Sequence, residues 1–240
     1  MRLFGVALLW CGLGGATERS LLVSAAVSLK EPFEALAQRF TKDHPEIKIT
    51  FNFAASGDLV RQIEAGAPVD LLATAAAEPM DRLERAHLIE PASRRTIAHN
   101  RLVLVTPRNK WLKWAELMRA RRVAIGDPRT VPAGQYALEL LDRLGLRAQL
   151  EPRLLYAANV RVALDLAARG EAEAAIVYAT DPVAASGLVV VDRAPDDLVV
   201  SYPMAVVSAS QERELGRAFI ALVMGPGGRQ LLRGHGFLLP

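Results

Sequence analysis

The chain of 240 residues has little of the features that mark specialised classes of protein. It has a single cysteine, so it forms no disulfide within itself, and no segment repeats at a period of about 20 to 50 residues, which excludes a solenoid. Lys and Arg number 29 against 26 Asp and Glu, and the densest basic cluster is only Arg119, Arg121 and Arg122. A nucleic-acid-binding protein would gather basic residues on one face. The sequence therefore predicts no nucleic-acid partner.

The usual catalytic motifs are also absent from the sequence. There is no G-x-S-x-G or H-E-x-x-H, and residues 225–230 (GPGGRQ) lack the Lys and Ser/Thr of a phosphate-binding loop. The four histidines are scattered. Asp70, Asp127 and Asp181 lie near predicted turns without a histidine nearby, which is typical of turn and cap residues. We therefore expect no enzyme, no cofactor and no metal held directly by the protein.

The first residues have the pattern of a secretory signal. Residues 3–13 form an apolar run after Arg2 that is too short to span a bilayer, and the small residues Gly14, Gly15 and Ala16 follow it. The sequence therefore predicts a signal peptide over residues 1–16 and a periplasmic location. A retained N-terminal anchor is the alternative, although Trp10 before Cys11 is too bulky for a lipoprotein processing site.

Strand-like and helix-like segments alternate along the rest of the chain, which predicts an α/β fold with mainly parallel sheets. Apolar residues recur at helical spacing in some segments and at every second position, or without interruption, in others. The predicted strands cover residues 21–26, 47–53, 69–75, 101–107, 122–128, 174–178 and 199–208. The predicted helices cover residues 30–42, 58–65, 79–86, 135–144, 160–168, 212–223 and 229–233, with one more beginning at Trp111.

Four of the predicted strand-to-helix turns place small or polar residues at the start of a helix. Free N–H groups and the positive end of the helix dipole favour an anion there, and ligands of open α/β sheets bind at this edge. The same residues are also ordinary helix caps, so one turn alone is weak support. The four turns contain Ser28 with Glu31 at capping-box spacing, Ser56 and Gly57, Ala133 and Gly134 after Pro132, and Asn159 with Val160.

Several longer segments resemble the periplasmic molybdate-binding proteins of ABC importers, the ModA family. They occur in the order that this family has and cover nearly all of the chain after residue 16. In combination, RQIEAGAPVDLLA and GDP…VPAGQYA are highly specific to the family. The resembling segments are VSAAVSLKEPFEALAQRF, FNFAASGDLVRQIEAGAPVDLLATAA, NRLVLVTPR, VAIGDPRTVPAGQYALELL, NVRVALDLAARGEAEAAIVYATD, VSYPMAVV and the closing residues 225–237.

The resemblance implies a type II periplasmic-binding-protein fold, in which two α/β lobes close around a hinge over a ligand cleft. It implies that residues 17–100 and 206–240 form lobe I and residues 101–205 form lobe II, with crossings near residues 99–102 and 204–206. The family holds a tetrahedral oxyanion by hydroxyl and backbone N–H groups, without ion pairs. These contacts fall on Ser28 and Ser56 in lobe I and on Ala133, Val160 and Tyr178 in lobe II.

The sequence departs from the family pattern beside the first two of these contacts. Val27 replaces the last residue of an alanine run, and Ala54 and Ala55 stand in a loop that is usually rich in serine. The contact residues are kept, so the departures affect the shape of the lobe I part of the pocket. Arg61 and Arg161 lie next to contact residues in the sequence, and we expect both on solvated helix faces.

The resulting hypothesis is a monomeric exported protein that captures molybdate, and tungstate as well, and delivers it to an ABC permease and its ATPase. A close alternative is a binding protein for another oxyanion such as sulfate, or for a small organic anion. A further alternative is the effector-sensing domain of a transcription regulator, which would need a helix-turn-helix segment. The last alternative is a hydrolase that uses Ser28 or Ser56 as its nucleophile.

Overall fold

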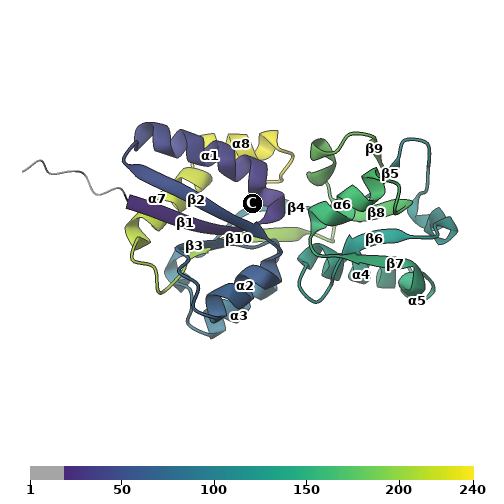
Figure 1. The fold of residues 1–240 in the computed structure, drawn as a ribbon, viewed down its shortest axis with the longest axis horizontal. Coiled ribbons are helices and arrows are strands. Elements are labelled where there is room, and N and C mark those ends of the chain that lie inside the picture. The colour runs from purple at the N-terminus through teal and green to yellow at the C-terminus, as the bar shows by residue number, and fades with distance from the viewer. Residues whose placement is uncertain (1–18) are drawn as a thin grey trace, which may run out of the picture.

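The protein folds into two α/β lobes that lie side by side, each built on its own five-stranded sheet (Figure 1). The structure is a computed structural model that describes residues 19–240, apart from the side chains of Val183 and Ala184. The predicted signal peptide, residues 1–16, lies outside the described residues. Within the described part of the chain, none of the helices is long and apolar enough to cross a membrane.

The first sheet has the strand order β2-β1-β3-β10-β4. The helices α1, α7 and α8 pack together on one side of it and α2 and α3 on the other, as Figure 1 shows. The strands are β1 (Arg19–Ala26), β2 (Ile47–Ala54), β3 (Leu71–Ala73), β4 (Arg95–Asn100) and β10 (Val200–Val206). The helices are α1 (Lys30–Asp43), α2 (Ser56–Glu64), α3 (Ala77–Arg85), α7 (Arg213–Met224) and α8 (Pro226–Gly234).

The second sheet has the strand order β7-β6-β8-β5-β9. Helix α6 covers one of its faces and α4 covers the other, with α5 against α4 (Figure 1). The strands are β5 (Leu102–Pro107), β6 (Val123–Gly126), β7 (Leu154–Ala157), β8 (Ala174–Tyr178) and β9 (Leu188–Arg193). The helices are α4 (Pro132–Arg143), α5 (Arg147–Leu150) and α6 (Val160–Ala168).

Apolar periodicity and glycine explain why the longer elements begin and end where they do. In α1 the buried residues include Phe33, Leu36 and Phe40, which recur at the predicted helical spacing. Phe33 and Phe40 both pack edge-on against Phe219 of α7, with ring centroids 6.0 Å and 5.8 Å apart. The turns after α2, α4 and α6 each contain a glycine at positive φ, the conformation that ends a helix at little cost: Gly66, Gly145 and Gly170.

The α/β fold is as predicted, but the sheets are mixed rather than mainly parallel. In the first sheet β1 pairs in parallel with β2 and β3, whereas β10 runs antiparallel to both β3 and β4. In the second sheet β6 pairs in parallel with β7 and β8, whereas β5 runs antiparallel to β8 and β9. The antiparallel pairs involve the strands next to the lobe crossings. Of these strands, β5 and β10 are the first after a crossing, so each enters its sheet from the other lobe and runs antiparallel to its neighbours.

The chain crosses between the two sheets at Arg101 and over residues 194–199. The first crossing lies where the sequence placed it, but the second does not, because all of β10 belongs to the first sheet. The predicted lobe II, residues 101–205, therefore includes most of β10, although the pairing of β10 with β3 and β4 places this strand in lobe I. Residues 199–208 have the pattern of one continuous apolar strand, and that pattern carries no information about which sheet the strand joins.

Some elements have no clear pattern in the sequence. The edge strands β4, β7 and β9 are absent from the predicted set, because none of them is a long and fully buried apolar run. The helix predicted from Trp111 is a short 3₁₀ helix, Trp114–Arg119, and Trp111 itself is exposed. Its register is set by Trp114, whose indole N–H donates to the carbonyl of Arg193 over 3.0 Å.

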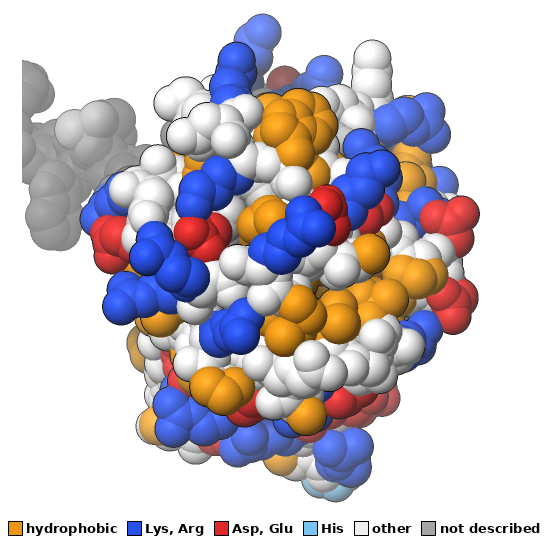
Figure 2. All heavy atoms as spheres, turned by 90° about the vertical axis from the view of Figure 1, so that its right-hand side faces the viewer, with side chains coloured by type: hydrophobic (Ala, Val, Ile, Leu, Met, Phe, Trp, Pro, Cys, Tyr) orange, Lys and Arg blue, Asp and Glu red, His pale blue; other side chains and the backbone are white. Residues whose placement is uncertain are grey.

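The outer end of the second lobe carries both signs of charge. Figure 2 shows Lys and Arg side chains interspersed with Asp, Glu and hydrophobic side chains over this face. Two members of the basic cluster noted in the sequence have acidic partners, since Arg119 lies 3.0 Å from Glu116 and Arg121 lies 3.5 Å from Glu173. The face shown is therefore not the continuous basic surface that nucleic-acid binding requires.

Candidate functional site

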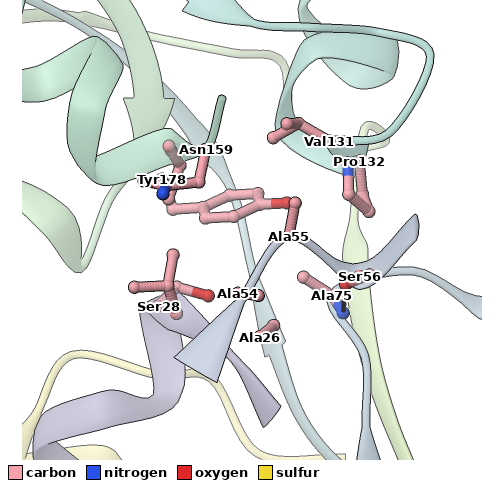
Figure 3. Close-up of a pocket in the computed structure, with 12 residues that line it drawn as sticks. Ala26, Ser28, Ala54, Ala55, Ser56, Ala75, Val131, Pro132, Asn159 and Tyr178 are labelled. Carbon is pink, nitrogen blue, oxygen red and sulfur yellow. Dashed lines mark hydrogen bonds between the residues drawn. The ribbon is translucent and has the colours of Figure 1, made fainter. Parts of the chain in front are cut away.

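A small pocket lies between the two lobes, where strand ends and helix starts of both face each other (Figure 3). Its empty space is about 220 Å³, part of it open to solvent. The cavity volume itself is only about 10 Å³, against roughly 300–1,000 Å³ for the pockets of drug-sized ligands, so this space admits only a small ligand. None of the lining residues carries a charge. They are Ala26, Val27, Ser28, Ala54, Ala55, Ser56 and Ala75 from lobe I, and Val131, Pro132, Asn159, Val160 and Tyr178 from lobe II.

Ser28 follows strand β1 in a single 3₁₀ turn, Val27–Leu29, that leads into α1. Its side chain is buried, and its hydroxyl lies 3.1 Å from the hydroxyl of Tyr202. The capping box suggested by Ser28 and Glu31 does not form, because the Ser28 hydroxyl faces Tyr202 and the Glu31 carboxylate faces the other lobe. The sequence therefore predicted the position of Ser28 correctly but not its partner.

Ser56 is the first residue of α2 and is also buried. Its side-chain oxygen accepts a hydrogen bond of 3.0 Å from the backbone N–H of Ala75, which follows β3. Because a backbone N–H can only donate, the hydroxyl proton of Ser56 is free to donate elsewhere. The turn thus offers a hydroxyl donor together with the N–H of Ser56 itself, since the next two N–H groups of the helix donate to the carbonyls of Thr130 and Ala55.

Helix α4 brings the backbone of Ala133 to the pocket. Pro132 occupies the first turn and lines the pocket, and Ala133 follows it, fully buried. The Ala133 N–H is one of the first-turn donors that have no carbonyl partner inside the helix. The next residue, Gly134, packs against the end of β6, where a Cβ would lie 1.9 Å from the carbonyl oxygen of Gly126. The absence of a side chain at Gly134 therefore allows the start of α4 to lie this close.

Helix α6 leaves its first N–H group unused in the same way. As predicted, Asn159 is the N-cap, and its side-chain oxygen accepts hydrogen bonds from the N–H groups of Arg161 and Val162, each over 3.0 Å. The cap thus occupies the second and third donors of the helix and leaves the first, Val160, to the pocket. Val160 and Asn159 both line it.

Tyr178 ends strand β8 and extends its ring across the centre of the pocket (Figure 3). Tyr178 is 2% exposed, and its hydroxyl has no hydrogen-bond partner among the residues that the structure describes. Burial raises the pKa of Tyr178 well above its ordinary value, and the nearby Tyr202 and Asp181 act in the same direction. The phenol is therefore neutral and can donate. A buried hydroxyl without a partner costs about 1–3 kcal/mol, which a bound acceptor would recover.

The structure thus brings the predicted site residues together from five different parts of the chain. Ser28, Ser56, Val160 and Tyr178 all line the pocket, and Ala133 follows a lining residue in the first turn of α4. Their polar side-chain groups are all hydroxyls, and Ala133 and Val160 offer backbone N–H groups at helix starts. The sequence did not single out Asn100 or Tyr202, which lie behind Ser28, because both lie in strands of ordinary composition.

A cluster of charged residues links the lobes beside the pocket. Arg161 donates to the Glu31 carboxylate across the interface over 2.7 Å, and its Nε lies 3.2 Å from Asp181 Oδ1. Asp181 is fully buried, and its other oxygen accepts from the N–H of Tyr178 over 2.9 Å. The expectation of a solvated Arg161 is therefore wrong, since only 18% of its side chain is exposed. Arg61 pairs with Asp58 on the surface of α2, as a solvated helix face implies.

Asp181 is expected to make stability fall as pH rises from about 4 to 7. Burial is the largest cause that raises its pKa from 3.8 to about 7, against the opposing effect of Arg161. Between these pH values the folded protein keeps a proton on Asp181 that the unfolded chain has lost. At about 1.36 kcal/mol per pKa unit, the free energy of unfolding is therefore higher by up to roughly 4 kcal/mol at the acidic end of the window than at the neutral end. Asp181→Asn should remove this pH dependence from urea-unfolding free energies measured between pH 4.5 and 7.5. The prediction would be contradicted if the free energy of unfolding fell with pH equally steeply in Asp181→Asn and in the exposed control Asp165→Asn.

The two lobes also meet through their backbones on the α2 side of the pocket. The N–H of Gly57, the second residue of α2, donates to the carbonyl of Thr130 in the loop before α4 over 2.9 Å. A Cβ at Gly57 would lie 2.7 Å from that oxygen and 2.9 Å from the Thr130 Cα. This contact and the Arg161–Glu31 pair hold the lobes together around the pocket.

Comparisons with known proteins agree with this architecture. The model of the family "Bacterial extracellular solute-binding protein" matches residues 21–238. The molybdate-binding protein ModA of Escherichia coli is 37% identical over 253 residues, which cover 100% of this chain and 98% of the relative. The periplasmic molybdate-binding protein of Azotobacter vinelandii has a TM-score of 0.83 at 23% identity, covering 92% of this chain and 99% of that one.

The same fold also occurs in a protein with a different oxyanion in its name. The sulfate-binding protein SubI of Mycobacterium tuberculosis has a TM-score of 0.80 at 17% identity, covering 91% of this chain and 86% of that one. At such identity the likeness shows only the fold. Family membership is shown instead by two other matches, namely the full-length match to a relative of 37% identity and the family model over residues 21–238. The chain belongs to the bacterial extracellular solute-binding proteins and, among them, to the ModA family.

Proposed function

We propose that this protein captures molybdate, and tungstate as well, in the pocket between its lobes and delivers the ion to the permease and ATPase of an ABC importer. On this proposal it acts outside the cytoplasmic membrane as a monomer, after removal of residues 1–16, and catalyses no reaction. The Tyr178 hydroxyl, buried in the pocket without a partner, is the observation that carries the proposal.

The proposed ligand contacts are the hydroxyls of Ser28, Ser56 and Tyr178 and the backbone N–H groups of Ala133 and Val160. Molybdate is a dianion without protons near neutral pH, so it can only accept hydrogen bonds, and all of these groups can donate. Charge-assisted hydrogen bonds contribute roughly 1.5–3 kcal/mol each. Five of them offset the costs of association and allow binding in the sub-micromolar range, as an order of magnitude.

The pocket's lack of charged side chains fits an ion that must also be released. The lining residues contribute no formal positive charge, so the dianion is held by dipoles and helix N-termini alone. A protonated phosphate would direct an O–H at a group that is itself a donor, which costs the site a hydrogen bond. Sulfate also lacks protons but is smaller than molybdate, so the protein can distinguish these two ions only through the size of the closed pocket.

Calorimetric titration of the purified protein with molybdate, tungstate and sulfate tests this function directly. We expect tight binding of the first two ions and much weaker binding of sulfate. Tight sulfate binding, or no heat with molybdate, would favour the alternative of a carrier for another anion. The hydrolase alternative predicts labelling by a serine-directed probe, and we expect none. The hydrogen-bond partners of Ser28 and Ser56 are Tyr202 and the Ala75 amide, neither of which is a general base at neutral pH.

Tyr178→Phe should weaken molybdate binding about tenfold, the size of one hydrogen bond to a charged group. The substitution removes only the unpartnered hydroxyl and leaves the ring packed against Tyr202, so the melting temperature should stay the same or rise. Tyr156→Phe is the matched control, because its hydroxyl bonds to Glu151 at the surface. Equal molybdate affinity in Tyr178→Phe and wild type would remove Tyr178 from the site.

A further inference from the structure

Tyr202 lies directly behind the pocket without lining it. It comes from the middle of β10, is fully buried, and directs its hydroxyl at Ser28 Oγ over 3.1 Å. Its ring is held on two sides, edge-on to Tyr178 with centroids 5.9 Å apart and edge-on to Phe237 at 5.3 Å. The phenol is thus fixed in place, and within residues 19–240 its hydroxyl has two side-chain partners, Ser28 and Asn100.

The direction of the hydrogen bond between Tyr202 and Ser28 follows from Asn100. The backbone N–H of Arg101 donates to Asn100 Oδ1 over 2.9 Å, which identifies the oxygen of that amide. Asn100 Nδ2 therefore faces the other way, 3.0 Å from Thr180 Oγ1 and 3.4 Å from the Tyr202 hydroxyl. An amide nitrogen only donates, so the Tyr202 oxygen accepts from Asn100, and Ser28 Oγ is the side-chain acceptor left for the Tyr202 proton among the described residues.

This order of donors leaves the Ser28 proton for the pocket. With its oxygen accepting from Tyr202, the Ser28 hydroxyl has its proton free to donate to a bound ion. Ser56 has the equivalent arrangement, because its oxygen accepts from the N–H of Ala75. Both serines in the pocket are therefore held as donors by groups behind them. A serine hydroxyl without such a partner could turn and accept a proton from the ligand instead.

We propose that Asn100 and Tyr202 are positioning residues that hold the Ser28 hydroxyl as a donor and thereby favour oxyanions without protons over oxyanions that carry one. The proposal rests on the proposed function, namely that the pocket binds a tetrahedral dianion. It concerns the ratio of affinities for two ions of the same shape, molybdate and phosphate. At neutral pH phosphate keeps at least one proton, whereas molybdate keeps none.

Tyr202→Phe tests the proposal with titrations of molybdate and inorganic phosphate at pH 7. We expect molybdate affinity to fall roughly fivefold to tenfold, because Ser28 loses the donor that orients it. Phosphate affinity should stay the same or rise, because Ser28 can then accept a hydrogen bond from the phosphate O–H. The ratio of molybdate affinity to phosphate affinity should therefore fall about tenfold or more. Asn100→Ala, which removes the donor to Tyr202, should shift the ratio in the same direction by a smaller factor.

A double-mutant cycle separates this role from a structural one. In a Ser28→Ala background there is no hydroxyl to orient, so adding Tyr202→Phe should leave the molybdate-to-phosphate ratio unchanged. A general loosening of the pocket would lower molybdate affinity in that background too. Tyr156→Phe, at the surface of β7, controls for loss of a phenol elsewhere.

Three results would overturn this proposal while leaving the proposed function intact. The first is an unchanged affinity ratio in Tyr202→Phe protein that melts cooperatively near the wild-type temperature. The second is a loss of equal size with and without the Ser28 hydroxyl. If Tyr202→Phe fails to fold, an unchanged ratio in Asn100→Ala is decisive instead. Failure of the wild type to bind molybdate is a separate outcome, which overturns the proposed function and this proposal with it.

Discussion

Gly134→Ala is expected to lower the free energy of unfolding by about 3 kcal/mol and to abolish tight molybdate binding. A Cβ at this position would lie 1.9 Å from the Gly126 oxygen, 2.6 Å from the Gly126 carbonyl carbon and 3.1 Å from the Pro128 nitrogen. All three are backbone atoms, so neither side-chain rotation nor local repacking relieves the contact. Overpacking in a core costs roughly 1–3 kcal/mol, and a clash with rigid backbone belongs at the upper end.

The loss of binding should exceed what the loss of stability explains. To relieve the clash, α4 must move away from the end of β6, and Ala133 moves with it out of reach of the ion. Urea unfolding and calorimetric titration at a temperature where the variant is folded measure the two effects separately. Gly234→Ala is the matched control, since a Cβ there meets nothing within 4 Å. A Gly134→Ala variant that binds molybdate like the wild type would show that α4 does not position the ion.

The parts of the site that the sequence predicted well are those set by local rules. Asn159 before an apolar helix and Pro132 in a first turn are recognisable without knowledge of the fold, because capping and proline geometry act within a few residues. The resemblance to the ModA family then united these turns and added Tyr178. Its phenol has no local signature, since a tyrosine at the end of a strand is more often simply part of a core.

The parts that the sequence did not predict are set by contacts between distant segments. Arg161 and Glu31 lie 130 residues apart and meet only when the lobes are placed together, so a helical arginine was indistinguishable from a solvated one. The side chains of Asn100 and Tyr202 meet diagonally across the β4–β10 pairing, which joins strands on either side of the two crossings. The second crossing itself was misplaced for the same reason, because strand pattern does not determine sheet membership.

The contacts between lobes bear directly on how the pocket holds an ion. A charge-free set of donors is worth most when water is excluded, because hydrogen bonds to an anion strengthen as the surroundings become less polar. The Gly57–Thr130 hydrogen bond and the Arg161–Glu31 pair are two of the contacts that hold both halves of the donor set around one space. Affinity should therefore depend on residues that never contact the ion.

Gly57→Ala tests how far the affinity for the ion depends on contacts between the lobes. It should weaken molybdate binding between about 5-fold and 150-fold without lowering the stability of the protein. The new Cβ would lie 2.7 Å from the Thr130 oxygen and 2.9 Å from its Cα, so the lobes cannot approach as they do here without strain of about 1–3 kcal/mol. Apart from that contact, alanine is a better helix former than glycine in α2, so the melting temperature of the ion-free protein should stay level or rise.

Titration calorimetry and small-angle scattering together distinguish a closure defect from a damaged site in Gly57→Ala. The wild type should become more compact when molybdate is added, whereas the variant should retain a larger radius of gyration even when saturated. Gly234→Ala again controls for the extra methyl group, because its surroundings are open. Wild-type affinity in Gly57→Ala would mean that the pocket binds its ion without this contact between α2 and the Thr130 loop, and that the donors of each lobe suffice where they stand.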